Sequence, residues 1–363
     1  MHFSTPEACT YALPIEVEGL QYYHHAAPLL LESGAVLPHL TIAYHTYGQL
    51  NAAKNNVIWV FHALTANSEV SDWWKGIFGP GRLLDPEKYF IVCPNILGSC
   101  YGTTGPRSIN PATGAAYGMD FPLITIRDFV AAHECLRQHL GIAQIYFALG
   151  GSCGGHQVLE YALFNPTLIQ HMGLLVTSAK ETAWAISIHE AGRMAIEADP
   201  SHRDNTDEAG SKGLRAARAM GLLGYRTIQS YIDRQTDDDE RTDGFRAASY
   251  VRYQGEKLDR RFYTHCYWHL LKALDSHDLG RGRGGAARAL QRINIPALVI
   301  GIDTDMLIPA SQQRFIAEHL PLGIYREISS KYGHDGFLIE TEKISQAFRD
   351  WGVLDGRSEM VRS

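Results

Sequence analysis

The sequence predicts an α/β fold with a mostly parallel central sheet, helices on both of its faces and a helical insertion late in the sheet. Three observations lead to this prediction. Short apolar runs recur along the chain and are continuous rather than alternating, as in strands that are buried on both faces. Segments with helical spacing lie between several of these runs. From about residue 180 to residue 290, helical segments and polar turns replace this rhythm.

Each expected element follows from one of these patterns. The runs expected to form strands are Val57–Phe61, Tyr89–Cys93, Ile145–Leu149, Leu174–Thr177 and Ala297–Ile300. The segments expected to form helices are Ile126–Leu140, His156–Phe164, Ala183–Glu197, Gly213–Arg234 and Phe262–Ala273. Ligands of open α/β sheets bind at the carboxyl ends of the strands, so a late helical insertion is most simply a lid over those ends. We therefore expect one main domain from residues 1–180 and 291–363, and a helical lid at residues 181–290.

The composition is that of an ordinary globular protein and excludes several function classes. The 363 residues carry a net charge of −6, so no basic excess exists to follow a phosphate backbone, and we expect no nucleic-acid partner. No stretch approaches the ~20 apolar residues that span a bilayer, and the N-terminus lacks the features of a signal peptide. The six cysteines are scattered without a CxxC pair, which predicts reduced thiols in a cytoplasm.

The stretch ALGGSCGGHQ, residues 148–157, lies between a predicted strand and a predicted helix. Gly150 to Gly154 form a G-x-S-x-G, and a strand, this motif and a helix make the nucleophile elbow of an α/β-hydrolase fold. The sharp turn exposes its central side chain above the sheet and requires small residues around it. Shifting the register by one residue makes Cys153 central in place of Ser152. Local spacing therefore leaves both residues open as the nucleophile.

The partners of such a nucleophile follow it along the chain as an acid and then a histidine. The run Ala297–Ile300 leads into a loop that contains Asp303 and Asp305, and either aspartate could be the acid. Further on, SSKYGHDGFLIE presents His334 in a glycine-flanked loop. His334 would take the proton of Ser152, and the aspartate would orient the imidazole and stabilise the imidazolium.

An oxyanion hole in this fold uses the backbone N–H after the nucleophile and a second N–H from the loop after an early strand. Cys153 would supply the first if Ser152 attacks. The strand Val57–Phe61 is followed by HALTAN, where the N–H of Leu64 is expected to be the second. The remaining histidines lack companions at metal-ligand spacing, so we expect no metal site.

These motifs together resemble the homoserine O-acetyltransferases of the α/β-hydrolase type over most of the chain. The matching stretches are YHTYGQLNAAKNNVIWVFHALT, GPGRLLDPEKYFIVCPNILGSCYGTTGP, DFPLITIRDFV, GGSCGGHQ, EAGRMAIEADP, Gly213–Tyr225, TDMLIP and YGHDGFLIE. The resemblance implies that Ser152 is the nucleophile, Asp305 the acid and His334 the base. It also implies an oxyanion position at Leu64.

The resemblance further implies which residues bind homoserine. The family's arginine and tyrosine match Arg218 and Tyr225, and the aspartate after the catalytic histidine matches Asp335. Arg218 would hold the carboxylate of homoserine bidentately, and Asp335 would hold its ammonium group. The family usually has methionine where this chain has Cys153 and His156, and it usually has glycine after HALT. Because these departures flank the acyl site, the acyl group stays open between acetyl and succinyl.

The implied reaction moves an acetyl group from acetyl-CoA to the hydroxyl of L-homoserine through an acyl-serine, with ping-pong kinetics. The product is a precursor for methionine biosynthesis. Acetyl-CoA would be a cosubstrate, and no cofactor is expected. The resemblance also implies a homodimer that forms through the lid. Three alternatives stay open: a transferase of the same family that uses succinyl-CoA or L-serine, an esterase, and a non-catalytic binding protein on this fold.

Overall fold

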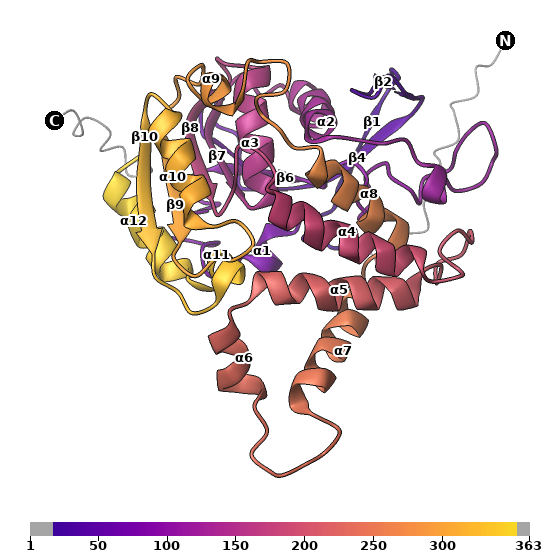
Figure 1. The fold of residues 1–363 in the computed structure, drawn as a ribbon. Helices are drawn as coiled ribbons and strands as arrows, with labels where there is room; N and C mark the ends of the chain where they lie inside the picture. The colour runs from indigo at the N-terminus through magenta and orange to yellow at the C-terminus, as the bar shows by residue number, and fades with distance from the viewer. Residues whose placement is uncertain (1–16, 354–363) are drawn as a thin grey trace.

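The computed structural model describes residues 17–353, and its centre is an eight-stranded sheet in the order β1-β4-β6-β5-β7-β8-β9-β10 (Figure 1). Strands β5 to β10 pair in parallel, whereas β1 and β4 add two antiparallel strands at one edge. The bounds are β1 Gln21–His25, β4 Leu40–Tyr47, β5 Val57–Phe61, β6 Phe90–Pro94, β7 Ile145–Gly151, β8 Ile169–Leu175, β9 Ala297–Ile302 and β10 Gly323–Ile328, with β2 Leu29–Leu30 and β3 Val36–Leu37 in a separate small sheet. This mostly parallel sheet confirms the predicted fold class.

Helices cover both faces of the sheet, because the central strands bury side chains on both sides. In β5, Trp59 and Phe61 pack into one hydrophobic core, and Ile58 and Val60 pack into a second core on the other face. Helices α2 and α3 contribute to the first core, and α1 and α12 to the second. The helices outside the late insertion are α1 Val70–Trp73, α2 Ile126–His139, α3 Cys153–Phe164, α10 Ala310–His319, α11 Gly336–Ile339 and α12 Thr341–Trp351, with short 3-10 turns η1 Gly118–Asp120 and η2 Gly333–Asp335.

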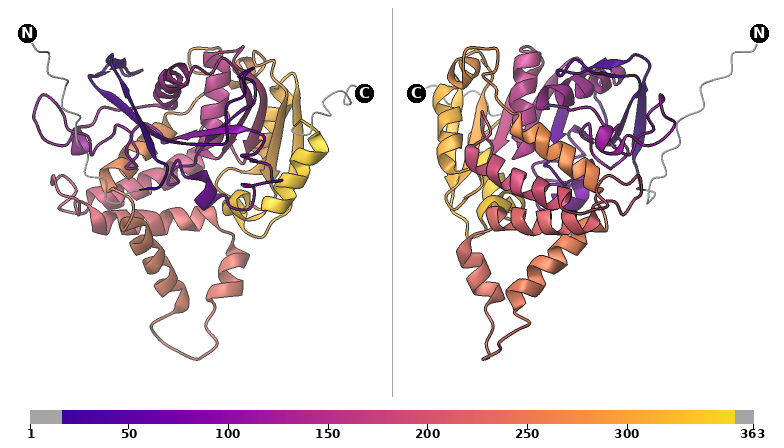
Figure 2. Two further views of the ribbon diagram at one scale, coloured as in Figure 1. Left: turned by 180° about the vertical axis from the view of Figure 1, so that it is seen from behind. Right: turned by 45° about the vertical axis from the view of Figure 1, so that its right-hand side comes forward.

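The described stretch between β8 and β9 contains only helices and loops apart from one isolated bridge. Its helices are α4 Ala183–Glu197, α5 Ser211–Tyr225, α6 Ile228–Gln235, α7 Arg246–Asp259, α8 Thr264–Asp275 and α9 Ala286–Leu290. Helices α4, α5 and α8 lie together against the body, whereas α6 and α7 project from it as a hairpin (Figures 1 and 2). Ile196 of α4 and Leu214 of α5 belong to the same core as Trp59 of the sheet. The domain limits proposed above, at residues 180 and 290, stay a prediction.

Several element bounds differ from those expected. Strand β8 begins at Ile169 and ends at Leu175, so the expected run at its end covers only its last two residues. Helix α3 begins at Cys153, three residues before the expected start. The expected helix at 213–234 is two helices, because Arg226 is extended and Thr227 caps α6 by accepting the N–H of Ser230. Strands β1 and β4 and helix α7 were not anticipated.

The sequence also led us to expect no membrane-spanning segment, no signal peptide and reduced cysteines. No described helix is both long and apolar enough to cross a bilayer. Residues 1–16, on which the signal-peptide expectation rests, lie outside the described residues, as does Cys9. The five described cysteines are free thiols.

Backbone segments approach one another very closely at the turn between β7 and α3. Ser152 has a φ of 55°, a conformation that L-residues rarely adopt. A Cβ on Gly150 would lie 2.4 Å from the carbonyl oxygen of Gly154, and a Cβ on Gly154 would lie 2.1 Å from that of Phe61. A Cβ on Gly155 would lie 2.5 Å from the Cβ of Thr177. Gly150, Gly154 and Gly155 are therefore required by close contacts within the turn, with β5 and with Thr177 after β8.

We expect Gly154→Ala to lower the free energy of unfolding by about 3 kcal/mol, because the added methyl meets a backbone oxygen of β5 that cannot move freely. Gly192→Ala in α4 is the matched control, since its Cβ would meet nothing closer than 3.4 Å. That variant is expected to stay within about 1 kcal/mol of wild type. Urea unfolding of both variants checks this, and equal stability of the two would contradict the packing argument.

Candidate active site

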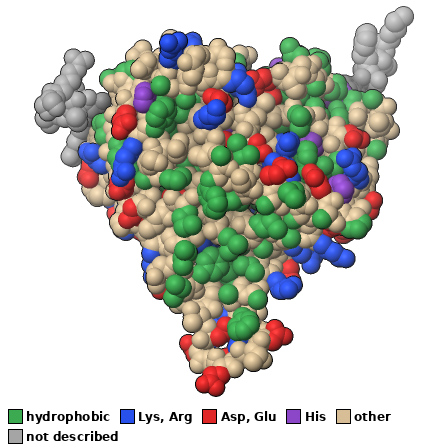
Figure 3. Space-filling model, viewed as in Figure 1, with side chains coloured by type: hydrophobic (Ala, Val, Ile, Leu, Met, Phe, Trp, Pro, Cys, Tyr) green, Lys and Arg blue, Asp and Glu red, His purple; other side chains and the backbone are tan. Residues whose placement is uncertain are grey.

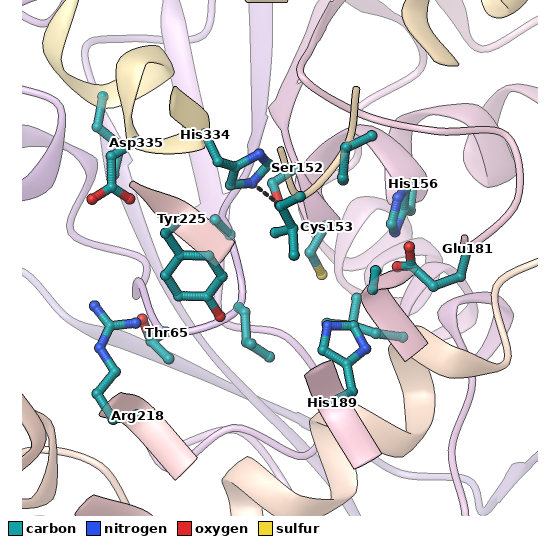
Figure 4. A pocket seen from close by; sticks show the side chains of 17 residues that line it. Thr65, Ser152, Cys153, His156, Glu181, His189, Arg218, Tyr225, His334 and Asp335 are labelled. Atoms are coloured by element: carbon teal, nitrogen blue, oxygen red, sulfur yellow. Dashed lines mark hydrogen bonds between the residues drawn. The ribbon is translucent and has the colours of Figure 1, made fainter. Parts of the chain in front are cut away.

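Ser152 lies at the carboxyl end of β7 and at the N-terminus of α3, with its hydroxyl facing a cavity (Figure 4). Its Oγ is 2.8 Å from Nε2 of His334. Its backbone is fixed on both sides, because its N–H donates to the carbonyl of Leu175 and its carbonyl accepts from the Thr177 hydroxyl. The strained turn therefore presents Oγ to the imidazole in a geometry suited to proton transfer.

Asp305 completes a chain of hydrogen bonds with His334. Its Oδ2 is 2.7 Å from Nδ1 of the imidazole, and its Oδ1 accepts the N–H groups of Leu307 and Ile308 at 2.9 and 3.0 Å. Asp303, the other candidate, is exposed and accepts the N–H of Ser330. The structure thus brings Ser152, His334 and Asp305 together in the order and contacts of a serine triad.

The electrostatic surroundings of His334 favour its charged form. Burial alone lowers the pKa of this imidazole, but the facing Asp305 carboxylate, with smaller contributions from Asp335 and Glu181, raises it. The net pKa lies above the ordinary imidazole value. An imidazole with this environment is a stronger base, and the carboxylates stabilise the imidazolium that forms after proton transfer.

Cys153, the other candidate nucleophile, has a different environment. Its side chain is almost fully buried, and burial raises the pKa of the thiol to about 12, although a hydrogen bond from Gln157 opposes that shift. A thiol with so high a pKa stays protonated near neutral pH, and the protonated form is a poor nucleophile. The contact with His334 is made by Ser152, so the geometry favours the register in which the serine is central.

Leu64 and Cys153, the expected oxyanion donors, both line the cavity beside Ser152. The N–H of Cys153 belongs to the first turn of α3, where helix N–H groups have no intrahelical acceptor. Leu64 lies in a turn closed by the bond from Ala66 N–H to the carbonyl of Ala63. Leu64 and Cys153 therefore both lie just after the carboxyl ends of strands, on the edge of the sheet where Ser152 faces the cavity.

Gln157 connects the two segments that carry these donors, a role that the sequence reasoning missed. Its Nε2 donates to the carbonyl of Cys153 at 3.1 Å and to the carbonyl of His62 at 3.3 Å. The side chain is fully buried, so few other groups can replace these bonds. The available signal was a polar residue near the start of a helix that is mostly apolar and buried.

Arg218, Tyr225 and Asp335 line the same cavity on one side of Ser152. The guanidinium of Arg218 lies over the ring of Tyr225, with 5.3 Å from Cζ to the ring centroid. Asp335 directly follows His334 and forms an ion pair with Arg226 at 3.0 Å. The structure therefore brings together all the residues proposed for the site, and it adds Arg226 as a partner of Asp335 that the sequence reasoning missed.

The cavity has a volume of about 100 Å³ and also contains polar residues that were not anticipated as site residues. Glu181 and His189 line it on the side of Cys153, away from Arg218 (Figure 4). Glu181 follows shortly after the carboxyl end of β8, which is a signal the sequence did offer. Within residues 17–353 no group of three or more His, Cys, Asp or Glu side chains could hold a metal ion.

Comparison with known proteins gives one family model and a group of similar relatives that share one activity. The family description "alpha/beta hydrolase fold" matches residues 56–341. The chain is 47% identical over 339 residues to the homoserine O-acetyltransferase of Cyclobacterium marinum, covering 93% of this chain and 96% of that protein. It is 44% identical to the homoserine O-acetyltransferase of Trichormus variabilis, over 91% of this chain and 92% of that protein.

Solved structures show the same fold. The homoserine O-acetyltransferase from Bacillus anthracis superimposes with a TM-score of 0.83 and 24% identity, covering 91% of this chain and 98% of that one. An acetylester hydrolase from Corynebacterium glutamicum superimposes with a TM-score of 0.79 and 22% identity, covering 91% and 96% of the two chains. Likeness at this level of identity is evidence for the fold alone, since the fold carries both transferases and hydrolases.

The raised pKa of His334 predicts the pH dependence of any reaction that uses it as a base. The neutral imidazole must accept the serine proton, so kcat/KM should fall as the pH drops through a pKa above the ordinary value of about 6.5. Asp305→Asn should move this acid limb to lower pH and reduce kcat by roughly 10³-fold or more. Asp303→Asn is the control. It should leave the acid limb in place and change kcat by no more than about 3-fold. A pH profile with an activated acetyl ester measures both, and the reverse pattern would assign the acid to Asp303.

Gln157→Met should lower kcat by about 10-fold or more with KM changed less than about 3-fold, because its bonds align the two oxyanion donors that act in the transition state. Affinity for a boronate analogue of the tetrahedral intermediate should fall in parallel. Thermal unfolding of the variant separates positioning from general destabilisation. A variant with normal kcat and normal boronate affinity would show that the hydrogen bonds of Gln157 are not needed to position the two donors.

Proposed function

The chain belongs to the homoserine O-acetyltransferases, a family of the α/β-hydrolase fold, and from this premise we propose that its reaction runs through an acyl-enzyme on Ser152. The enzyme acetylates the hydroxyl of homoserine, a step of methionine biosynthesis. One observation carries the proposed mechanism, the continuous contact from Ser152 Oγ to His334 Nε2 at 2.8 Å and from His334 Nδ1 to Asp305 Oδ2 at 2.7 Å. The proposed donor is acetyl-CoA, which acts as a cosubstrate, and the scheme needs no cofactor.

In the first half-reaction, Oγ of Ser152 attacks the thioester carbonyl while His334 Nε2 takes the hydroxyl proton. The N–H groups of Leu64 and Cys153 stabilise the tetrahedral oxyanion, an effect worth roughly 3 kcal/mol for each donor. The C–S bond then breaks, and the imidazolium returns the proton to the departing thiolate. Free CoA leaves, and the acetyl group stays as an ester on Ser152.

In the second half-reaction, the hydroxyl of homoserine attacks the acetyl-serine while His334 removes its proton. The ester bond to Ser152 breaks, and Oγ recovers the proton from the imidazolium. The product is O-acetyl-homoserine. Because CoA leaves before the amino acid reacts, the scheme requires ping-pong kinetics.

The proposed acceptor site is the side of the cavity that contains Arg218, Tyr225 and Asp335. The Arg218 guanidinium suits the carboxylate of the acceptor, and the Asp335 carboxylate suits its ammonium. Asp335 is paired with Arg226, so the ammonium would share this carboxylate with that guanidinium. The opposite charges of Arg218 and Asp335 in one cavity favour an amino acid as the acceptor. A neutral alcohol, such as a general esterase releases, would leave both charges without a partner in the substrate.

A hydrolase remains the second candidate, because an acetylester hydrolase has the same fold. Transfer requires that water be kept from the acetyl-serine and that the acceptor be held in place. Ala185 and His189 of α4, with Arg218 and Tyr225 of α5, form part of the cavity wall, so the insertion contributes to its seclusion. The charged groups of the proposed acceptor site, Arg218 and Asp335, support the transferase proposal over hydrolysis.

The proposed assembly is a homodimer that forms through the insertion. Hydrophobic side chains gather over α5 and the base of the α6–α7 hairpin (Figure 3). Exposed members of this surface are Met220, Leu223, Ile228 and Ile232. Apolar patches of this kind often mark contacts between chains. A cytoplasmic location is proposed with it, in keeping with the scattered free cysteines.

A free-CoA release assay tests the proposed mechanism. Acetyl-CoA is offered with L-homoserine, with L-serine or without an acceptor, to wild type, Ser152→Ala and Cys153→Ala. We expect continuous release only with homoserine and at most one CoA per active site without an acceptor, a loss of more than about 10³-fold in Ser152→Ala, and activity within about 10-fold of wild type in Cys153→Ala.

Other outcomes would point elsewhere. Equal release without an acceptor would indicate a hydrolase. Activity that survives Ser152→Ala but disappears in Cys153→Ala would move the nucleophile by one residue.

A further inference from the structure

Two groups of polar side chains line the cavity on opposite sides of Ser152 (Figure 4). One group contains Arg218, Tyr225 and Asp335, which the proposed function assigns to the acceptor. The other contains His156, Glu181 and His189 beside Cys153, and the mechanism gives these residues no task. We call this second side the Glu181 end.

The chemistry of the two half-reactions assigns a ligand group to each side. His334 must protonate the departing thiolate and later deprotonate the incoming hydroxyl, so both groups approach from the side of the imidazole. Asp335 is the next residue in the chain, and the Tyr225 ring lies 6.1 Å from the His334 ring, so that side is the Arg218 side. The substituent of the acyl group must then point the other way, toward the Glu181 end.

The charges at the Glu181 end do not suit an anion. The Glu181 side chain is buried, with one hydrogen bond from the N–H of Thr182 at 3.0 Å. Nδ1 of His189 contacts the carboxylate of Asp275, which is also paired with Arg193. Among the described residues that line the cavity, Arg218 has the one guanidinium or ammonium group, and it lies on the opposite side.

His156 adds no positive charge to this end of the cavity. Its ring stacks on the ring of His277 at 4.0 Å between centroids, and its Nε2 contacts the hydroxyl of Ser178. Burial, with the neighbouring histidines, lowers its pKa well below the ordinary value, so it is neutral near neutral pH. An acyl group that ends in a carboxylate would therefore meet Glu181 with no free cation to compensate it.

We propose that Glu181 selects the acyl donor: the Glu181 end accepts the short, uncharged acyl group of acetyl-CoA and rejects acyl groups that end in a carboxylate, such as succinyl. This proposal rests on the proposed function, since it assumes an acyl-CoA donor and an acyl-serine. It makes Glu181 a specificity-determining residue that repels the wrong donor and has no part in the proton transfers.

The test compares kcat/KM for acetyl-CoA, propionyl-CoA and succinyl-CoA, each with L-homoserine, over a range of pH on the alkaline side of neutrality, because burial raises the pKa of Glu181 and the repulsion requires its carboxylate to be ionised. Wild type should prefer acetyl-CoA to succinyl-CoA by about 100-fold or more. Glu181→Gln, which removes the charge at nearly constant shape, should raise the succinyl-to-acetyl ratio by about 10-fold or more. The propionyl-to-acetyl ratio should stay within about 3-fold, because neither donor carries a charge on its acyl group.

Two further variants control for effects other than charge in the cavity. Glu181→Asp keeps the charge and should keep the rejection of succinyl-CoA. Glu208→Gln removes an exposed carboxylate from a loop outside the cavity and should leave all the ratios unchanged.

An unchanged succinyl-to-acetyl ratio in folded Glu181→Gln, or a wild-type preference for succinyl-CoA, would overturn the proposal. Failure of the proposed function would look different, since wild type would then form no acetyl ester of homoserine from acetyl-CoA. If Glu181→Gln does not fold, the wild-type protein decides the question, because its succinyl-to-acetyl ratio should rise as the pH falls and Glu181 takes up a proton. A ratio that does not change with pH would overturn the proposal.

Discussion

The strained turn at Ser152 is the constraint on which the rest of the site depends. A non-glycine residue at a φ of 55° costs on the order of 1–3 kcal/mol, and the surrounding contacts must hold it there. The glycines allow α3 to approach β5 and β7 so closely that the turn has no room to relax. In return, Oγ points out of the sheet toward an imidazole 182 residues later in the chain. The same turn places the N–H of Cys153 beside the reacting atom.

The sheet brings the remaining triad members to this point. Strands β9 and β10 are parallel neighbours, so the loops after them, which contain Asp305 and His334, leave the sheet at the same edge. Asp305 is held by backbone N–H groups of its own loop, and it therefore orients the imidazole from a rigid base. The order of the strands therefore brings the three triad residues together, and no single loop does so alone.

Much of this was readable in the sequence because apolar runs and glycine spacing are local signals. The parallel strands, the elbow and the loop of His334 could all be predicted that way. Local signals could not decide between Asp303 and Asp305, since both follow the same strand. The family resemblance implied Asp305, and the fold shows that Asp305 is buried against His334 while Asp303 is exposed. Gln157 was missed because one of its two carbonyl partners, that of His62, lies far away in the chain. Glu181 was missed because only the fold shows that it lines the cavity. The break between α5 and α6 was missed because Thr227 acts as a cap only once the chain turns there.

The insertion and the sheet share one hydrophobic core. Residues of α4, α5 and α8 are buried in the same hydrophobic cluster as the central strands, so the insertion is not a detachable module on a finished scaffold. Removing it would open the main core to water and leave the sheet helices without part of their packing. Because the insertion and the sheet share one core, a large cavity made in α4, α5 or α8 is expected to lower the stability of the sheet as well.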